Sequence, residues 1–138
     1  MLIINGTVHT MEGLTIPGGY VDIRGDKIAG TGPMEECPKS WEGEVFDAQG
    51  GHIQPGFVDA HCHLGMFGDS TGIEGDDGNE ATDPCTPHLR AVDAVNPMDR
   101  GFQEAREAGV TTVLTGPGSA NPISGQFAAL KTNGRWVD

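Results

Sequence analysis

The fold of the chain is decided by one stretch near its middle, which reads Ile53-Gln54-Pro55-Gly56-Phe57-Val58-Asp59-Ala60-His61-Cys62-His63. Alternate side chains of a strand point to opposite faces, so His61 and His63 would share one face, with their Cα atoms about 6.6 Å apart. Two neutral imidazoles placed in this way can reach one metal ion at roughly 2.0–2.1 Å. The stretch therefore predicts a metal site at the carboxyl end of a strand.

The side chains that precede and surround the histidines are largely apolar on both faces of this strand. Phe57 and Asp59 share the histidine face. The opposite face carries Val58, Ala60, Cys62 and Leu64. A parallel strand that is covered on both sides needs two such faces. We therefore expect a buried strand, with Cys62 as a small buried hydrophobic residue.

An H-x-H triplet is a weak signal by itself, because a half-exposed strand with two ordinary histidines would also contain it. Three neighbouring features favour metal ligation. Pro55-Gly56 breaks the chain before the strand, Asp59 lies two residues before the first histidine, and a glycine-rich loop begins directly after the strand. Together these features describe a strand that ends in a site.

Length and charge limit the possible classes of protein. The 138 residues suffice for one ordinary domain but not for a complete eight-stranded α/β barrel, which needs about 250 residues. The net charge is -12, so the chain lacks the basic surface typical of a nucleic-acid-binding protein. An anionic bilayer would repel a protein of this charge. No secretory signal and no run approaching the roughly 20 apolar residues of a membrane span is present. We expect a cytoplasmic protein that binds neither nucleic acid nor membrane.

The cysteines are odd in number and lack the C-x-x-C spacing. They are Cys37, Cys62 and Cys85. This pattern argues against a disulfide framework and against a structural zinc knuckle.

The first part of the chain reads as short strands joined by turns. Asn5-Gly6, between apolar residues 2–4 and residues 7–10, predicts a hairpin, and Gly25-Asp26 predicts another. Val45–Asp47 has the composition of a further strand. We expect a small antiparallel β module.

A long irregular segment, rich in glycine and proline, follows the histidine strand over residues 65–97. Loops of this length are usually lids, binding loops or disordered segments. Its acidic residues are Asp69, Glu74, Asp76, Asp77, Glu80 and Asp83. We expect a solvated acidic loop here in preference to a specific cation site.

Helix and strand signals return after this loop. Asn96-Pro97 is suited to begin a helix, and Ala108-Gly109 to end it. The β-branched residues 110–115 then predict a strand. Strand, loop, helix and strand make a βαβ unit, whose two strands run parallel.

Residues 47–63 resemble the signature of the amidohydrolase superfamily of metal-dependent hydrolases. This signature has an acidic residue and glycine, then Pro-Gly, a hydrophobic pair and Asp-x-His-x-His. Residues 108–113 resemble the family's second helix-to-strand junction, and residues 2–8 are similar to the start of its N-terminal β segment. Residues 116–126 resemble imidazolonepropionase-like members.

The resemblance implies an α/β fold with two parts. Residues 1–52 would form an N-terminal β-sandwich segment, and residues 53–138 would begin a (β/α)₈ TIM barrel with its strands 1 and 2. It also implies that His61 and His63 bind a divalent metal, usually zinc, as one or two ions at the mouth of the barrel. The remaining ligands and a catalytic aspartate would come from later strands and are not assigned here.

Other polar residues near the motif have open or negative assignments. Asp59 is a candidate to orient a ligand imidazole through a hydrogen bond. The alternative is a carboxylate held by backbone amides near Pro55-Gly56. His52 lies before the strand and His88 lies in the long loop, so we expect neither to be a ligand of this site.

The leading hypothesis is a metal-dependent amidohydrolase, which would use a metal-activated water to hydrolyse a C–N bond in an amide or cyclic amide of a small molecule. The alternative is an inactive fragment, or a module that binds metal or a partner. Two barrel strands alone expose apolar faces and unpaired edges. We therefore expect a homo-oligomer or association through the exposed barrel strands.

Overall fold

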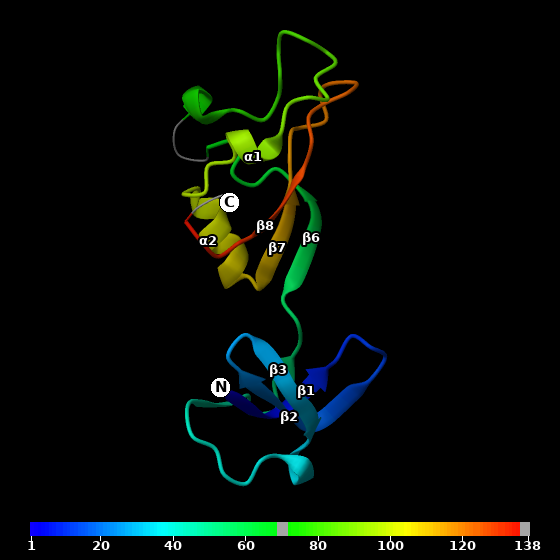
Figure 1. The fold of residues 1–138 in the computed structure, drawn as a ribbon, viewed down its shortest axis with the longest axis vertical. Helices are drawn as coiled ribbons and strands as arrows, with labels where there is room; N and C mark the ends of the chain where they lie inside the picture. Colours follow the sequence, from blue (N-terminus) through cyan, green and yellow to red (C-terminus); the bar gives the residue numbers. More distant parts are fainter. Residues whose placement is uncertain (69–71, 136–138) are drawn as a thin grey trace. The chain divides into compact units, whose positions relative to one another are not determined.

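The computed structural model describes residues 1–68 and 72–135, which form a mixed α/β structure with two β-sheets (Figure 1). Contacts between Cα atoms divide the chain into two compact units, Met1–Pro55 and Gly56–Asp138. The boundary expected from the sequence lay between residues 52 and 53.

The first unit contains a mixed five-stranded sheet. β2 (Thr15–Arg24) lies between β3 (Lys27–Pro33) and β1 (Leu2–His9) and is antiparallel to both. β4 (Val45–Asp47) and β5 (His52–Ile53) pair with β1 in parallel. The prediction of a purely antiparallel module is therefore wrong for β4 and β5, although the strand at Val45–Asp47 is confirmed.

The hairpin predicted at Asn5-Gly6 is wrong. Leu2–His9 is one continuous strand whose register with β2 shifts between Ile3 and Gly6, and Asn5 adopts a φ of 58°. Asparagine tolerates this left-handed conformation. A Cβ at Gly6 would lie only 2.7 Å from Cγ1 of Ile53, so glycine leaves room for that side chain to pack across the strand. The dipeptide makes an irregularity within a strand instead of a turn between two strands.

The predicted turn at Gly25-Asp26 is confirmed, because Arg24 pairs directly with Lys27 across the β2–β3 hairpin. The buried residues of this unit include Leu2, Val8 and Val21. Asp22 is also buried, and its carboxylate pairs with Arg24 at 3.1 Å. A short 3-10 helix, η1 (Met34–Glu36), follows β3.

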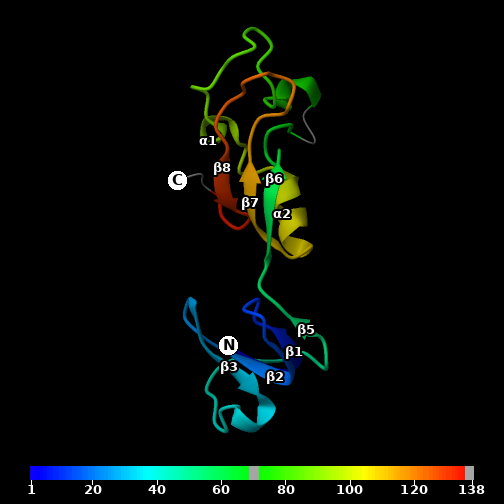
Figure 2. The ribbon, with the colours of Figure 1, turned by 90° about the vertical axis from the view of Figure 1, so that its right-hand side faces the viewer.

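The second unit contains a three-stranded sheet in the order β6-β7-β8 (Figures 1 and 2). β6 (Phe57–Cys62) and β7 (Val110–Thr115) are parallel, which confirms the predicted βαβ unit. β8 (Ala128–Lys131) returns antiparallel to β7. The sequence reading did not predict this third strand.

The segment between β6 and β7 contains a 3-10 helix, η2 (Gly72–Gly75), and the helices α1 (Ala91–Ala94) and α2 (Arg100–Glu107). Much of the rest is irregular, as expected for the long loop; Asp69 lies outside the described residues. Within the described ranges, no helix combines the length and the apolar character that crossing a membrane would require.

Helix α2 begins later than the sequence predicted. Asp99 is its N-cap and accepts a hydrogen bond from the backbone N–H of Gly101 at 2.7 Å. The Asn96 side chain instead accepts from the N–H of Met98 at 3.0 Å, which makes a turn before the helix. The predicted end is confirmed, because Gly109, with a φ of 88°, follows the last turn.

The core of the second unit joins the helices to the central strand β7. Its buried residues are Met66, Ala91, Val95, Phe102 and Val113. Cys62 and Leu64 pack against this core and are half-buried. They are two of the four residues that the strand pattern placed on the face away from the histidines, and the other two, Val58 and Ala60, are exposed.

The prediction that the histidine strand is buried on both faces is wrong for this chain. Phe57 is 56% exposed and Val58 is 68% exposed. The reason is that β6 pairs with β7 along one edge, while among the described strands none pairs with its other edge. An edge strand has neighbouring side chains on one side only, and the core of this unit covers Cys62 and Leu64 but leaves Phe57 and Val58 exposed.

Candidate metal centre

The structure brings His61 and His63 together at the carboxyl end of β6. The two ring centroids lie 5.3 Å apart, and the ring planes meet at 83°. His61 is exposed and His63 is half-buried. The ring of Phe127, from the loop after β7, lies 5.2 Å from the His61 ring and 6.4 Å from the His63 ring. Both imidazoles are therefore near one point of the surface, beside an aromatic wall.

A backbone carbonyl selects the tautomer of the neutral His63 ring. The Nδ1 atom of His63 lies 2.7 Å from the carbonyl oxygen of Gly116. A carbonyl only accepts hydrogen bonds, so Nδ1 carries the proton and donates it, which leaves the lone pair on Nε2. Metal-binding histidines are usually held by a bond of this kind.

The Gly116 peptide is itself tied to the histidine strand. Its N–H donates to the carbonyl of Cys62 at 3.2 Å, and its own carbonyl accepts from His63. A Cβ at position 116 would overlap the ring of Phe127. Because residue 116 is glycine, its backbone can form hydrogen bonds to the histidine strand while the Phe127 ring packs against it. Residues 116–126 entered the sequence analysis only through a resemblance, and this role of Gly116 was not predicted.

Asp59 was proposed to bond to a ligand imidazole, but its observed partner is a backbone N–H. Its Oδ1 atom accepts a hydrogen bond from the backbone N–H of His61 at 3.1 Å. This matches the kind of bond, to a backbone amide, that the alternative named, although at His61 instead of at Pro55-Gly56. A bond from Asp59 to a ligand imidazole stays a prediction.

Two further histidines, His52 and His88, and the lysine Lys131 lie outside the His61–His63 pair. His52 belongs to the first unit, where its ring bonds to His9, and His88 lies in the long loop. Lys131, on β8, donates from Nζ to the hydroxyl of Thr112 at 3.0 Å. Within residues 1–68 and 72–135, no group of three or more His, Cys, Asp or Glu side chains is placed to hold a metal ion. His61 and His63 are thus two imidazoles to which the described part of the chain adds no third side chain of these kinds.

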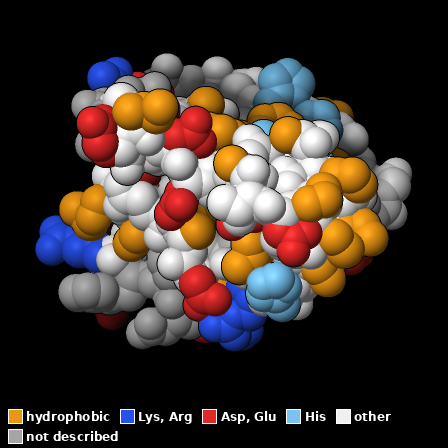
Figure 3. Space-filling view, turned by 90° about the horizontal axis from the view of Figure 1, so that it is seen from above, with side chains coloured by type: hydrophobic (Ala, Val, Ile, Leu, Met, Phe, Trp, Pro, Cys, Tyr) orange, Lys and Arg blue, Asp and Glu red, His pale blue; other side chains and the backbone are white. Residues whose placement is uncertain are grey.

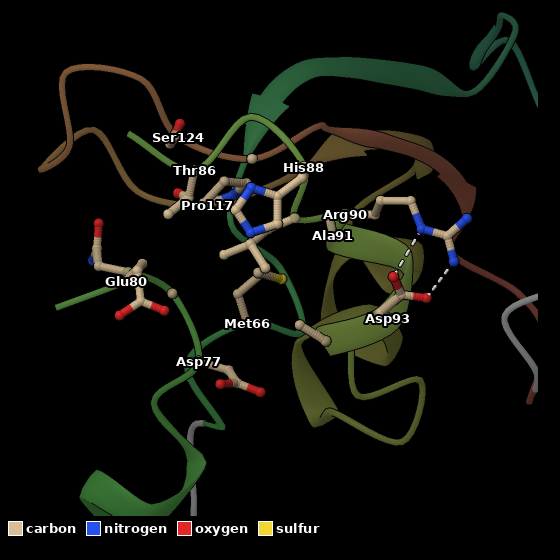
Figure 4. A pocket seen from close by; sticks show the side chains of 15 residues that line it. Met66, Asp77, Glu80, Thr86, His88, Arg90, Ala91, Asp93, Pro117 and Ser124 are labelled. Atoms are coloured by element: carbon tan, nitrogen blue, oxygen red, sulfur yellow. Dashed lines mark hydrogen bonds and ion pairs between the residues drawn. The ribbon is translucent and has the colours of Figure 1, made fainter. Parts of the chain in front are cut away.

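A pocket of about 310 Å³ lies in the second unit (Figure 4). Figure 4 shows His88 and Met66 near its centre, Asp77 and Glu80 on one side and the Arg90–Asp93 pair on the other. Its lining includes Pro117, which follows Gly116 in the sequence, but neither His61 nor His63 lines it.

Hydrogen bonds favour the charged forms of three side chains that line this pocket, Glu80, Arg90 and Asp93. The hydroxyl and the backbone N–H of Thr82 donate to Glu80 at 2.6 Å and 2.7 Å and lower the pKa of its carboxyl. Arg90 donates to Asp93 at 2.6 Å and 2.8 Å, which lowers the pKa of Asp93 and raises that of Arg90. On the face seen in Figure 3, acidic side chains are spread among hydrophobic and uncoloured surface.

Comparisons with known proteins agree on one family. The chain is 38% identical over 106 residues to the amidohydrolase tasK of Hapsidospora irregularis, a match that covers 76% of this chain and 10% of tasK. It is 32% identical over 132 residues to an imidazolonepropionase of Streptomyces griseus, covering 89% of this chain and 33% of that protein. No protein-family model matches the chain.

A solved structure has the same fold and a related sequence. The crystal structure of an amidohydrolase from Thermotoga maritima superposes with a TM-score of 0.86 at 40% identity. The superposition covers 99% of this chain and 34% of the Thermotoga protein. The chain therefore belongs to the amidohydrolase superfamily, a family of hydrolytic enzymes that act on C–N bonds, and it matches the N-terminal portion of these proteins. It spans at most about a third of the length of the relatives described here.

Proposed function

We propose that this chain supplies the first metal-ligand motif of a metal-dependent amidohydrolase, an enzyme that hydrolyses a C–N bond in an amide or cyclic amide of a small molecule. The observation that carries the proposal is the convergence of His61 and His63, with the Nε2 lone pair of His63 left available by the bond to Gly116.

In this proposal the two imidazoles hold a divalent metal, with zinc as the first choice because nitrogen ligands suit it. A divalent metal supplies two effects at such a site: it makes a water molecule a stronger acid and it polarises a carbonyl oxygen. The protein residues have the task of placing it. Gly116 keeps the His63 ring in one tautomer and orientation, and Phe127 shields one side of the rings from water.

Two histidines do not complete a catalytic zinc site, which uses at least three protein ligands. We propose that the further ligands and the catalytic carboxylate come from strands that would follow β6 and β7 in a (β/α)₈ barrel, with residues 1–52 as part of a β-sandwich segment. The support for this is the similarity to the Thermotoga amidohydrolase and the parallel pairing of β6 with β7. We place the enzyme in the cytoplasm.

The test compares His61→Ala/His63→Ala with His88→Ala in the protein that contains this chain together with the strands that complete the barrel. His88 is an exposed histidine of the same unit that lies outside the pair, so it is a matched control. We expect the double variant to lose bound zinc and hydrolysis of amide substrates, and the control to keep both. Full metal content and full hydrolysis in the double variant would overturn the proposal.

A second candidate is a partner-binding module that needs other chains to complete its core. The free edge of β6 and the exposed side chains of Phe57 and Val58 favour it, because unpaired strands and apolar surface promote association. Gel filtration of this chain at several concentrations tests it. We expect association that increases with concentration, whereas a monodisperse monomer with sharp thermal unfolding would contradict it.

A further inference from the structure

A second pair of histidines lies in the first unit. The Nε2 atom of His9, on β1, and the Nδ1 atom of His52, on β5, are 2.7 Å apart. The ring planes differ by 19°, and the centroids are 5.0 Å apart. In this arrangement the N–H of one ring donates a hydrogen bond to the lone pair of a nitrogen on the other ring.

The pairing of strands explains why these two distant residues meet. β1 and β5 are parallel, with His52 opposite Thr7. Residues 7 and 9 of a strand point to the same face, so the side chain of His9 is a diagonal neighbour of His52. His52 is exposed and His9 is half-buried, so both rings can be reached from solvent.

We propose that His9 and His52 form a binding site for a late first-row divalent cation, with Cu²⁺ as the preferred ion. Imidazole nitrogens suit copper, nickel and zinc, and Cu²⁺ forms the most stable complexes of the divalent series. The site lies within Met1–Pro55 and so does not depend on the function proposed for His61 and His63.

The distance between the nitrogens, which the hydrogen bond between the rings sets, is compatible with a square arrangement of ligands. Two nitrogens at adjacent corners of a square, each about 2.0 Å from the ion, lie about 2.8 Å apart, whereas tetrahedral ligands lie about 3.3 Å apart. The observed 2.7 Å is close to the square value. The rings need only turn so that both lone pairs point at one ion, with water at the remaining corners.

Binding also requires the proton between the rings to move. Each histidine then carries its proton on the nitrogen that faces away from the ion. For His9 that atom is Nδ1, which has the hydroxyl of Thr15 at 3.4 Å as a nearby acceptor. For His52 it is Nε2, on an exposed ring that can donate to water. A partner for the outer nitrogen is the usual support of a metal-binding histidine.

The experiment titrates the chain with Cu²⁺ in a background that lacks the other pair, His61→Ala/His63→Ala. Binding is measured by isothermal titration calorimetry, and the nitrogen ligands are identified by electron paramagnetic resonance. We expect one bound Cu²⁺ with coupling to two imidazole nitrogens. Adding His9→Gln or His52→Gln should lower the affinity at least tenfold and remove one nitrogen from the spectrum, and adding His88→Gln should change neither.

Unchanged Cu²⁺ affinity in both His9→Gln and His52→Gln would overturn the proposal, as would an equal loss with His88→Gln. Paramagnetic broadening in the NMR spectrum of the unsubstituted chain gives a second measurement that does not depend on how a variant folds. Broadening at low Cu²⁺ that reaches the His9 and His52 rings supports the site, and broadening that spares both rings contradicts it.

Discussion

Strands β1 and β6 have similar apolar sequences but different surroundings. β1 is paired along both edges, and its Leu2 and Val8 are each 3% exposed. β6 is paired along one edge, and its Phe57 and Val58 are 56% and 68% exposed. The difference teaches that an apolar strand contributes to stability only where neighbours cover it, because the hydrophobic free energy follows the area removed from water.

We expect the largest loss of folding stability from a substitution at a buried residue of the second unit. Phe102 is 6% exposed and belongs to the core around Val113. We expect Phe102→Ala to destabilise this unit by about 3–5 kcal/mol. The matched change Phe57→Ala removes the same ring from an exposed position and should cost far less. Chemical denaturation of both variants makes the measurement, and equal losses would contradict the comparison.

Two valines compare the strands directly. We expect Val8→Ala, in β1, to cost about 2 kcal/mol, because it removes two buried carbon groups and leaves a small cavity. Val58→Ala, in β6, should stay within about 0.5 kcal/mol of the unsubstituted chain. Hydrogen exchange of the amides of each sheet can locate the losses. A loss at Val58 as large as that at Val8 would indicate that β6 is covered in solution, for example by a second copy of the chain.

The histidine pair lies at the carboxyl end of β6, and its support from Gly116 can be tested there. We expect Gly116→Ala to displace the Phe127 ring and to disturb the bond to His63, which should lower zinc affinity about tenfold. Gly30→Ala is the control, because the nearest atom to its added Cβ is the Tyr20 hydroxyl at 3.9 Å. Unchanged zinc affinity in Gly116→Ala would show that this peptide does not support the site.

The smallest expected effect is at a surface ion pair of the second unit. The bond from Arg90 lowers the pKa of Asp93 below its ordinary value of 3.8. A lowered carboxyl pKa stabilises the folded state at pH values above the unfolded pKa, and this stabilisation is lost as the pH falls through the folded pKa. Both groups are exposed, so the effect should be small.

We therefore expect Asp93→Asn to lower the melting temperature slightly near pH 7. The difference from the unsubstituted chain should shrink as the pH falls below the ordinary aspartate pKa and through the lowered pKa of folded Asp93, where the aspartate becomes protonated as well. A difference that persists in acid would mean that the asparagine perturbs the structure in some other way.

Local patterns predicted those parts of the fold that depend on neighbours in sequence. The turn at Gly25-Asp26 and the end of α2 at Gly109 are of this kind. The parallel pair β6–β7 joins distant residues and followed instead from the rule for βαβ connections. The hairpin expected at Asn5-Gly6 was wrong because Ile53, far along the chain, packs over Gly6 and keeps the strand continuous.

The same distinction applies to the candidate sites. His61 and His63 are two positions apart, so strand geometry alone placed their rings on one face. The Gly116 carbonyl and the His9–His52 contact depend on which strands pair and in which register. A single sequence does not specify that register, and so the reading could not anticipate either contact.

One buried hydroxyl anchors the chain where the histidine strand passes into the long loop. Thr115, at the end of β7, is 0% exposed and donates to the carbonyl of Leu64 at 2.7 Å. Leu64 directly follows His63, so the strand end is pinned before the loop begins. Met66, two residues further along, is buried in the core, so the first residues of the loop are held as well. An incoming molecule would therefore meet imidazoles that stand on an anchored strand end.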